Sequence, residues 1–172
     1  MPLPLQTPRL TLRSPRDAEA LLAVSGDPEA MRYVGDSRTR NLEELRRAIA
    51  RGIVLESERG FNMFVVVRRT DGQVLGDCGL SIWKPTGETE IGWRFAKEHW
   101  GHGFAHEAAL EVLRFAAEEV GLRRLISVIH PENLASRKLA ERLGFVVERE
   151  DAHLGVPVIY YARDLYSLEH GR

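Results

Sequence analysis

The sequence predicts a mixed α/β or α+β domain, with helices flanking one sheet that is mostly antiparallel. Three features of the 172 residues support this expectation: segments in which polar and apolar residues alternate, a long segment with a helical apolar period, and a tight-turn signal at Asp71-Gly72. The long helical segment lies between two strand-like segments, 88–95 and 125–129. Since a strand, a helix and a second strand of one sheet connect by a right-handed crossover, those two strands should run parallel.

The amino-terminal part is predicted to hold one short strand and two helices. Residues 9–13 alternate between polar and apolar side chains, and Ser14-Pro15 ends that strand. A weak helix is expected over 17–25, with four residues on one face: Ala18, Leu21, Leu22 and Ser25. Asn41 is expected to cap a second helix, whose apolar stripe would consist of Leu42, Leu45, Ala48, Ile49 and Ile53.

The rest of the chain is predicted to combine six strands with two further helices. The expected strands are 61–68, 73–83, 88–95, 125–129, 145–150 and 156–163. A long helix from about His102 to Val120 would bury an apolar stripe made of Ala105, Ala108, Ala109, Val112, Leu113, Ala116 and Val120. Asn133 can cap the second helix, which should reach Leu143.

The composition is that of a soluble globular protein. Hydrophobic residues make up 44% of the chain and charged residues 28%, and no apolar run approaches the roughly 18 residues that span a bilayer. The formal net charge of −1 argues against duplex nucleic acid as a partner. Cys78 is the single cysteine, so no intrachain disulfide can form, which agrees with a cytoplasmic location. The opening Met-Pro-Leu-Pro-Leu lacks the basic start of a signal peptide, and no linker divides residues 1–172, so we expect one domain.

A glycine-rich segment at the start of the long helix is the main candidate for ligand binding. It consists of Trp100, Gly101, His102, Gly103, Phe104 and Ala105. A helix start offers unpaired amide groups and a positive dipole end, so this segment can bind phosphate or pyrophosphate. The alternative is that the glycines only allow a tight turn. A P-loop is not indicated because Gly-Lys-Ser/Thr is absent, and a dinucleotide fold would have a third glycine where His106 stands.

Three segments, in order along the chain, carry a family resemblance. They are residues 7–13, Glu90-Ile91-Gly92-Trp93 together with residues 100–108, and residues 133–145. They resemble the opening strand, motif A and motif B of the GNAT superfamily of acetyltransferases. The branch that they resemble most is that of the ribosomal-protein N-terminal acetyltransferases of the RimJ/RimL type. The likeness covers about residues 7–165.

The resemblance implies an acetyl-CoA-dependent N-acetyltransferase, in which an amine attacks the thioester directly in a ternary complex. The acceptor would be a protein N-terminal α-amine or, as a second option, a small-molecule amine. In this fold strands 88–95 and 125–129 splay apart, and a backbone amide near the end of the first could polarise the thioester carbonyl. The residues expected to contact acetyl-CoA are Phe95, Ala96, Lys97, Trp100, Gly101, His102, Gly103, Phe104, Ala105, Asn133 and Lys138.

Two residues are expected to take part in the chemistry. Glu90 would be the general base, directly or through water; alternatively it forms a structural hydrogen bond or shapes the acceptor pocket. Ser136 would donate to the departing thiolate; alternatively it helps to cap the helix that follows Asn133. The tyrosine that many family members use to protonate the thiolate corresponds to Ala140 here, which keeps open a non-catalytic acyl-CoA-binding module. A nucleotide-binding protein that uses the glycine-rich segment is a further alternative.

Other residues with chemical potential have weaker signals. No metal is expected, since neither HExxH nor a cysteine pair accompanies the three neighbouring histidines His99, His102 and His106. Cys78 is expected to be a buried small hydrophobe, and would be a nucleophile only beside a base.

The acceptor pocket is expected to form from residues 17–58 and 150–157. Four aromatic residues either line its groove or belong to the core: Trp83, Trp93, Tyr160 and Tyr161. The sequence also leaves open whether two copies of the chain pair through an edge strand to form a homodimer.

Overall fold

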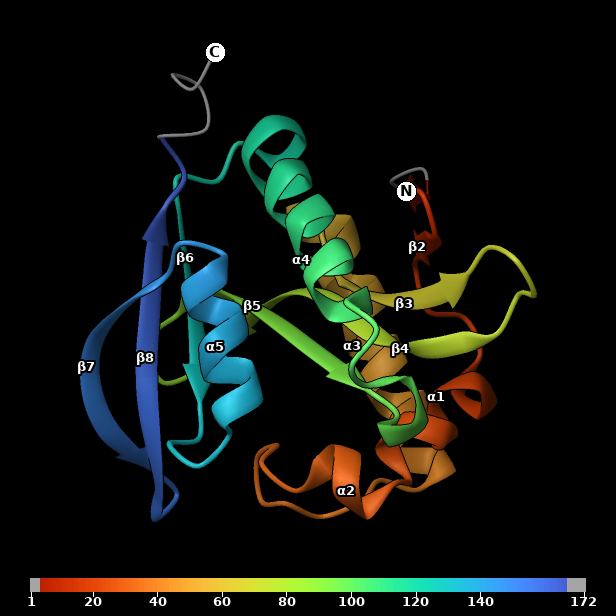
Figure 1. The fold of residues 1–172 in the computed structure, drawn as a ribbon, viewed down its shortest axis with the longest axis horizontal. Helices are drawn as coiled ribbons and strands as arrows, with labels where there is room; N and C mark the ends of the chain where they lie inside the picture. The colour runs from red at the N-terminus through yellow and green to blue at the C-terminus, as the bar shows by residue number, and fades with distance from the viewer. Residues whose placement is uncertain (1–3, 167–172) are drawn as a thin grey trace.

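The computed structural model describes residues 4–166, which are built around one eight-stranded sheet (Figure 1). The strand order is β1-β2-β3-β4-β5-β6-β8-β7. The strands are β1 (Leu5–Gln6), β2 (Leu10–Arg13), β3 (Met63–Arg68), β4 (Val74–Trp83), β5 (Glu88–Phe95), β6 (Arg124–Ile129), β7 (Val146–His153) and β8 (Val156–Asp164). Neighbouring strands are antiparallel except β5 and β6, which run parallel, as the strand, helix, strand order predicts.

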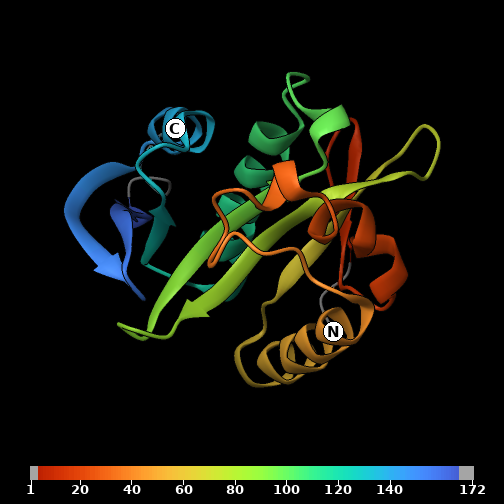
Figure 2. The same ribbon diagram turned by 90° about the horizontal axis from the view of Figure 1, so that it is seen from below.

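Helices cover both faces of this sheet. The α-helices are α1 (Ala18–Ser25), α2 (Pro28–Met31), α3 (Leu42–Arg59), α4 (Phe104–Phe115) and α5 (Leu134–Arg142). A 3₁₀ turn, Lys97–His99, precedes α4, and a π-helical turn, Ala116–Val120, continues it. The sheet passes between α3 on one side and α4 and α5 on the other (Figure 2). Within residues 4–166, no helix combines the length and the apolar character needed to cross a bilayer.

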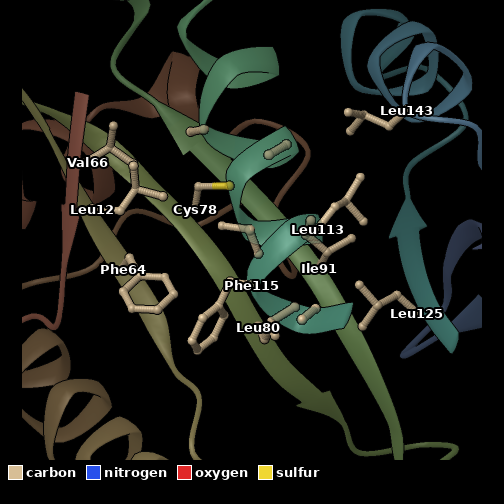
Figure 3. Close-up of a cluster of buried hydrophobic side chains, with 14 of the residues drawn as sticks. Leu12, Phe64, Val66, Cys78, Leu80, Ile91, Leu113, Phe115, Leu125 and Leu143 are labelled. Atoms are coloured by element: carbon tan, nitrogen blue, oxygen red, sulfur yellow. The ribbon is translucent and has the colours of Figure 1, made fainter. Parts of the chain in front are cut away.

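The main core lies between α4 and the sheet (Figure 3). The predicted stripe of α4 is confirmed at five positions that are completely or almost completely buried: Ala108, Ala109, Val112, Leu113 and Ala116. The Phe115 ring meets the Phe64 ring of β3 edge-on, with 5.5 Å between centroids. Cys78 of β4 is fully buried in the same cluster, and burial raises the pKa of its thiol, so it packs as a small hydrophobe, as expected.

The stripe predicted for α3 is only partly right. Leu45 is buried and Ile49 packs beside it, but Ala48 and Ile53 face solvent. Ile53 faces solvent because Gly52 takes the position on α3 that faces the sheet. The contact there is too close for a side chain, since a Cβ added at Gly52 would come within 2.4 Å of the Asn62 side chain. A stripe defined by apolar residues alone cannot reveal a glycine that sits at the contact.

Two elements were not predicted, because each is too short to show a period. Strand β1 has two residues, and α2 has four, begun by Asp27 whose side chain accepts from the Glu29 amide. Helix α2 and the irregular segment after it lie near the end of β5, below the sheet in the view of Figure 1. Their placement matters because residues 29–36 form part of the candidate site.

Candidate functional site

The site begins where β5 and β6 separate. Their parallel ladder has a single register pair, Glu90 with Ile126, and beyond it the Val128 amide of β6 donates to the Glu90 carboxylate at 2.9 Å. On the other side of β5, the Ala96 amide donates to a β4 carbonyl. Since bonding direction alternates along a strand, the Phe95 N–H points away from β4, toward the opening between β5 and β6.

Two cavities flank this opening. The loop cavity, of about 440 Å³, lies between residues 99–101 and 103–106, one face of α5, and α2 with the segment that follows it. The strand cavity, of about 560 Å³, lies beside β5 and β6 and is bordered by residues 33–40 and the β7–β8 turn. They share six lining residues, so they meet at Tyr33, Val34, Trp93, Arg94, Asn133 and Ser136. A long ligand in the first cavity can therefore present one end to a second ligand in the other.

The loop cavity contains the uncapped start of α4. Gly103 is the N-cap residue and has no side chain to bond the first amides of the helix. Gly101 and Gly103 have φ values of 79° and 77°, a backbone region that favours glycine. A Cβ added at Gly101 would meet no protein atom within 4 Å, so the space beside the loop is open. These amides and the helix dipole make an anion-binding surface.

Trp100 ties this loop to the end of β5. Its indole nitrogen donates to the Phe95 carbonyl at 2.8 Å, although almost half of the side chain remains exposed. The Phe95 carbonyl is thereby occupied, while its amide stays directed at the opening. The loop and the strand end thus have one fixed relative position.

Glu90 lies in the strand cavity with its carboxylate partly buried. Burial raises the pKa of Glu90 from 4.5 to about 7, and the hydrogen bond from the Val128 amide opposes part of that rise. The other carboxylate along this cavity, Asp36, is bound by the Arg40 guanidinium at 3.0 Å and by the Arg38 amide at 3.2 Å. A carboxyl group that titrates near neutral pH can exchange protons under physiological conditions.

Ser136 lies at the junction of the cavities, held from two sides. Its amide donates to the Asn133 side chain at 3.2 Å, so Asn133 caps α5 as predicted while also lining both cavities. Its hydroxyl oxygen accepts from the Trp93 indole at 3.1 Å. Because a hydroxyl has one proton to give, this contact leaves the Ser136 O–H free to donate into the junction.

Arg94 brings a guanidinium to the junction, and Asp77 neutralises it. Arg94 Nε donates to Asp77 Oδ1 at 3.0 Å, and a second contact joins the Nη2 and Oδ2 atoms. Asp77 raises the pKa of Arg94, so the guanidinium stays charged and paired. The ion pair therefore fixes the Arg94 side chain, which lines both cavities, without adding net charge.

The structure brings most of the predicted binding residues to the loop cavity, but four lie outside its lining: Ala96, Lys97, His102 and Lys138. Ala96 is almost fully buried, and the Lys97 amine lies 4.0 Å from Glu29. The His102 carbonyl bonds Arg9.

Lys138 misses the loop cavity because of its place on α5. The lining face of α5 runs through Ala135, Leu139 and Arg142, with helical spacing, and Lys138 is one position off it and exposed.

Several lining residues had not been singled out from the sequence, among them Arg142 and Tyr33. Arg142 shares a face with Leu139, a spacing that could have identified it. Tyr33 stands at the junction, its ring 5.1 Å from that of His130, and no periodic signal in the irregular segment points to it.

The aromatic residues divide between the two expected locations. Trp83 and Trp93 line the strand cavity, whereas Tyr160 and Tyr161 are buried in the core. His153 and Leu154 of the 150–157 connection border the same cavity. Among residues 4–166, no three His, Cys, Asp or Glu side chains gather as metal ligands would.

Comparison with known proteins gives a consistent family match. The family described as Acetyltransferase (GNAT) domain matches residues 9–146. The uncharacterised N-acetyltransferase p20 of Bacillus licheniformis is 33% identical over 147 residues, which are 84% of this chain and 83% of that protein.

Solved structures share the fold. The crystal structure of the acetyltransferase from Agrobacterium tumefaciens str. C58 superposes with a TM-score of 0.80 at 24% identity, covering 95% of this chain and 95% of that chain. RimL, a ribosomal L7/L12 α-N-protein acetyltransferase solved in complex with coenzyme A, gives a TM-score of 0.77 at 18% identity, covering 94% of this chain and 98% of that chain.

Proposed function

Because the chain belongs to the GNAT acetyltransferase family, we propose that this acyltransferase moves the acetyl group of acetyl-CoA onto a primary amine by direct attack in a ternary complex. The observation that carries the proposal is the meeting of the two cavities at Ser136. The donor would occupy the loop cavity and the amine would enter from the strand cavity. Neither substrate then has to move between half-reactions, so no covalent enzyme intermediate is needed.

The residues of the loop cavity fit acetyl-CoA. Its pyrophosphate would lie on the uncapped amides that follow Gly103, where a helix start stabilises negative charge. Its pantetheine arm would run along β5, past the Phe95 amide that points into the opening. That amide would then lie near the thioester carbonyl and stabilise the negative charge that develops on it. Arg142 lines the same cavity and would add positive charge near the phosphates, whereas burial and the Arg142 charge lower the pKa of His106 and favour its neutral ring.

The strand cavity favours an acceptor with one positive charge. Asp36 is already bound by Arg40, so within the described lining Glu90 is the carboxylate without a cationic partner. Trp83 and the 88% exposed Leu154 offer apolar surface beside it. A protein N-terminal α-amine is the acceptor we propose first, and a small monoamine second. An α-amine has a pKa near 8, so it needs little help to become neutral.

Glu90 and Ser136 would handle the protons. As the amine nitrogen attacks the thioester carbon, Glu90 takes a proton from it, directly or through water, and the C–S bond breaks. The Ser136 hydroxyl would keep its proton and donate a hydrogen bond to the departing thiolate, a task for which Ala140 has no hydroxyl, and the thiolate would take its proton from solvent. The Trp93 indole supports this role because it occupies the Ser136 oxygen as an acceptor and leaves the proton free.

A panel of amines tests the proposal. Purified protein is incubated with acetyl-CoA and, separately, with peptides bearing free N-termini, N-terminally blocked lysine peptides, monoamines and polyamines, and the acetylated products are identified by mass spectrometry. We expect acetylation of α-amines of peptides, or of monoamines, ahead of polyamines. Binding of acetyl-CoA without any acetylated product across the panel would favour the non-catalytic acyl-CoA-binding module instead.

A further inference from the structure

Arg9, immediately before β2, reaches the loop of residues 100–103 from a distant part of the chain. Its Nη1 donates to the His102 carbonyl at 2.9 Å, and its Nε donates to Glu107 Oε2 at 2.7 Å. The guanidinium also lies over the Phe104 ring, 4.4 Å from its centroid. Arg9 thus contacts three consecutive features of the loop: the residue between the two glycines, the first residue of α4 and the carboxylate one turn into it.

Glu107 is fixed in turn by the amino-terminal segment. Its Oε1 accepts from the Thr7 hydroxyl at 2.6 Å and from the Arg9 amide at 2.9 Å. Burial raises the pKa of Glu107, but these bonds and the Arg9 charge outweigh it, so the net pKa is lowered and the carboxylate stays ionised. The amino-terminal segment therefore fixes the Glu107 carboxylate, and that carboxylate holds the Arg9 guanidinium in one position beside the loop.

The loop itself has little internal restraint at this point. Gly101 and Gly103 lie on either side of His102, and glycine crosses between positive and negative φ with little cost. The peptide group that joins His102 to Gly103 is planar and trans, so its C=O and N–H point in opposite directions. When Arg9 holds the His102 carbonyl, the Gly103 N–H must point away from Arg9.

We propose that Arg9 is a positioning residue that holds the His102–Gly103 peptide group so that the Gly103 amide faces the donor's pyrophosphate. Arg9 lies outside the lining of both cavities, so the proposed role acts through its hydrogen bond to the His102 carbonyl. The inference rests on the proposed function, because the anion it serves is the pyrophosphate of acetyl-CoA. Without Arg9 the peptide group is free to rotate, and binding must first select the competent orientation.

The test is the affinity for coenzyme A, measured by isothermal titration calorimetry, which needs no turnover. We expect Arg9→Met to weaken coenzyme A binding about tenfold, the size of one lost charge-assisted hydrogen bond. Pantetheine, which has no pyrophosphate, should bind the wild type and Arg9→Met equally. An equal loss for both ligands, or no loss for coenzyme A, would overturn the proposal.

Arg69→Met is the matched control. Arg69 donates to the Thr7 carbonyl at 2.9 Å and to the Pro8 carbonyl at 3.5 Å, so its hydrogen bonds go to the same amino-terminal segment and not to the loop. Its loss should leave coenzyme A affinity within twofold of the wild type. If Arg69→Met weakened coenzyme A binding as much as Arg9→Met, disturbance of the segment would explain both effects and the positioning role would fail.

Arg9→Lys separates position from charge. Lysine keeps the positive charge but has one nitrogen, so it cannot bond Glu107 and the His102 carbonyl in the same way. We expect it to lose most of the affinity that Arg9→Met loses. Wild-type affinity in Arg9→Lys would show that charge alone matters and would overturn the proposal. Failure of the proposed function would appear elsewhere, as absence of amine-dependent product in the wild type.

Discussion

In the proposed reaction, single residues at the junction would carry out the proton transfers. Glu90 faces the strand cavity without a cationic partner among the described residues and has a pKa raised to about 7, chiefly by burial. Ser136, on the opposite element, has its oxygen occupied by Trp93 and its proton free. A proton acceptor and a proton donor therefore flank the place where the cavities meet, which is what amine attack with thiolate departure requires.

Glu90→Gln should change the pH dependence of the reaction. In the wild type, kcat/KM should rise as Glu90 loses its proton near pH 7 and rise again near pH 8 as an α-amine becomes neutral. The variant should lack the first rise and lose roughly a hundredfold in kcat/KM at pH 7.5. An unchanged profile would assign Glu90 the alternative role of shaping the pocket.

The same substitution should change stability in a defined direction. The folded protein holds the Glu90 proton more tightly than the unfolded chain, so the free energy of unfolding falls as pH rises from about 4.5 to about 7. Glu90→Gln removes this loss and should be about 3 kcal/mol more stable relative to wild type at pH 8 than at pH 4. Urea denaturation at the two pH values measures it, and an equal difference at both would rule out the raised pKa.

Ser136→Ala should separate turnover from donor binding. We expect kcat to fall about tenfold or more while the KM for acetyl-CoA stays within twofold, because the hydroxyl acts as the thiolate departs. Ser57→Ala, at an exposed hydroxyl on α3 that bonds the Val54 carbonyl, is the control and should behave as wild type. Equal kcat in Ser136→Ala would leave Ser136 with a capping role only.

At the scale of elements, the proposed donor site depends on the start of α4 and on the separation of β5 from β6. An α-helix commonly begins with a side chain that bonds its first amides, and here Gly103 leaves them open. The parallel pair ends after one register position, and Glu90 replaces the missing backbone partner of Val128. The uncapped helix start leaves its first amides free, and the separation of the strands leaves the Phe95 amide directed at the opening.

Gly103→Val should therefore abolish most donor binding. A side chain at φ 77° strains the loop and so displaces the amides that follow Gly103, and we expect acetyl-CoA affinity to fall roughly a hundredfold. Gly121→Val is the matched control, since Gly121 has the same φ of 77° and ends the π-helical turn after α4. It should lose comparable stability but keep its affinity. Equal affinity in folded Gly103→Val would contradict the assignment of the loop.

At the scale of the whole molecule, local sequence patterns predicted the helices and strands better than the contacts between elements that are distant in the sequence. Alternation located β5 at Glu88–Phe95, and the helical period located the buried stripe of α4. Tyr33 could not be placed, because the irregular chain after α2 has no period. The ion pair between Arg9 and Glu107 joins positions 98 apart in the sequence, and only the tertiary fold brings them together. The shared border of the two cavities is likewise a product of that fold.

Release of CoA thiol from acetyl-CoA, followed with and without an α-amine peptide, measures whether transfer is direct. If donor and acceptor meet at Ser136 in a ternary complex, CoA should appear only after the amine is added, in amounts equal to the acetylated peptide. A burst of CoA before any amine is present, with the acetyl group found on the protein, would contradict direct transfer and indicate a covalent intermediate.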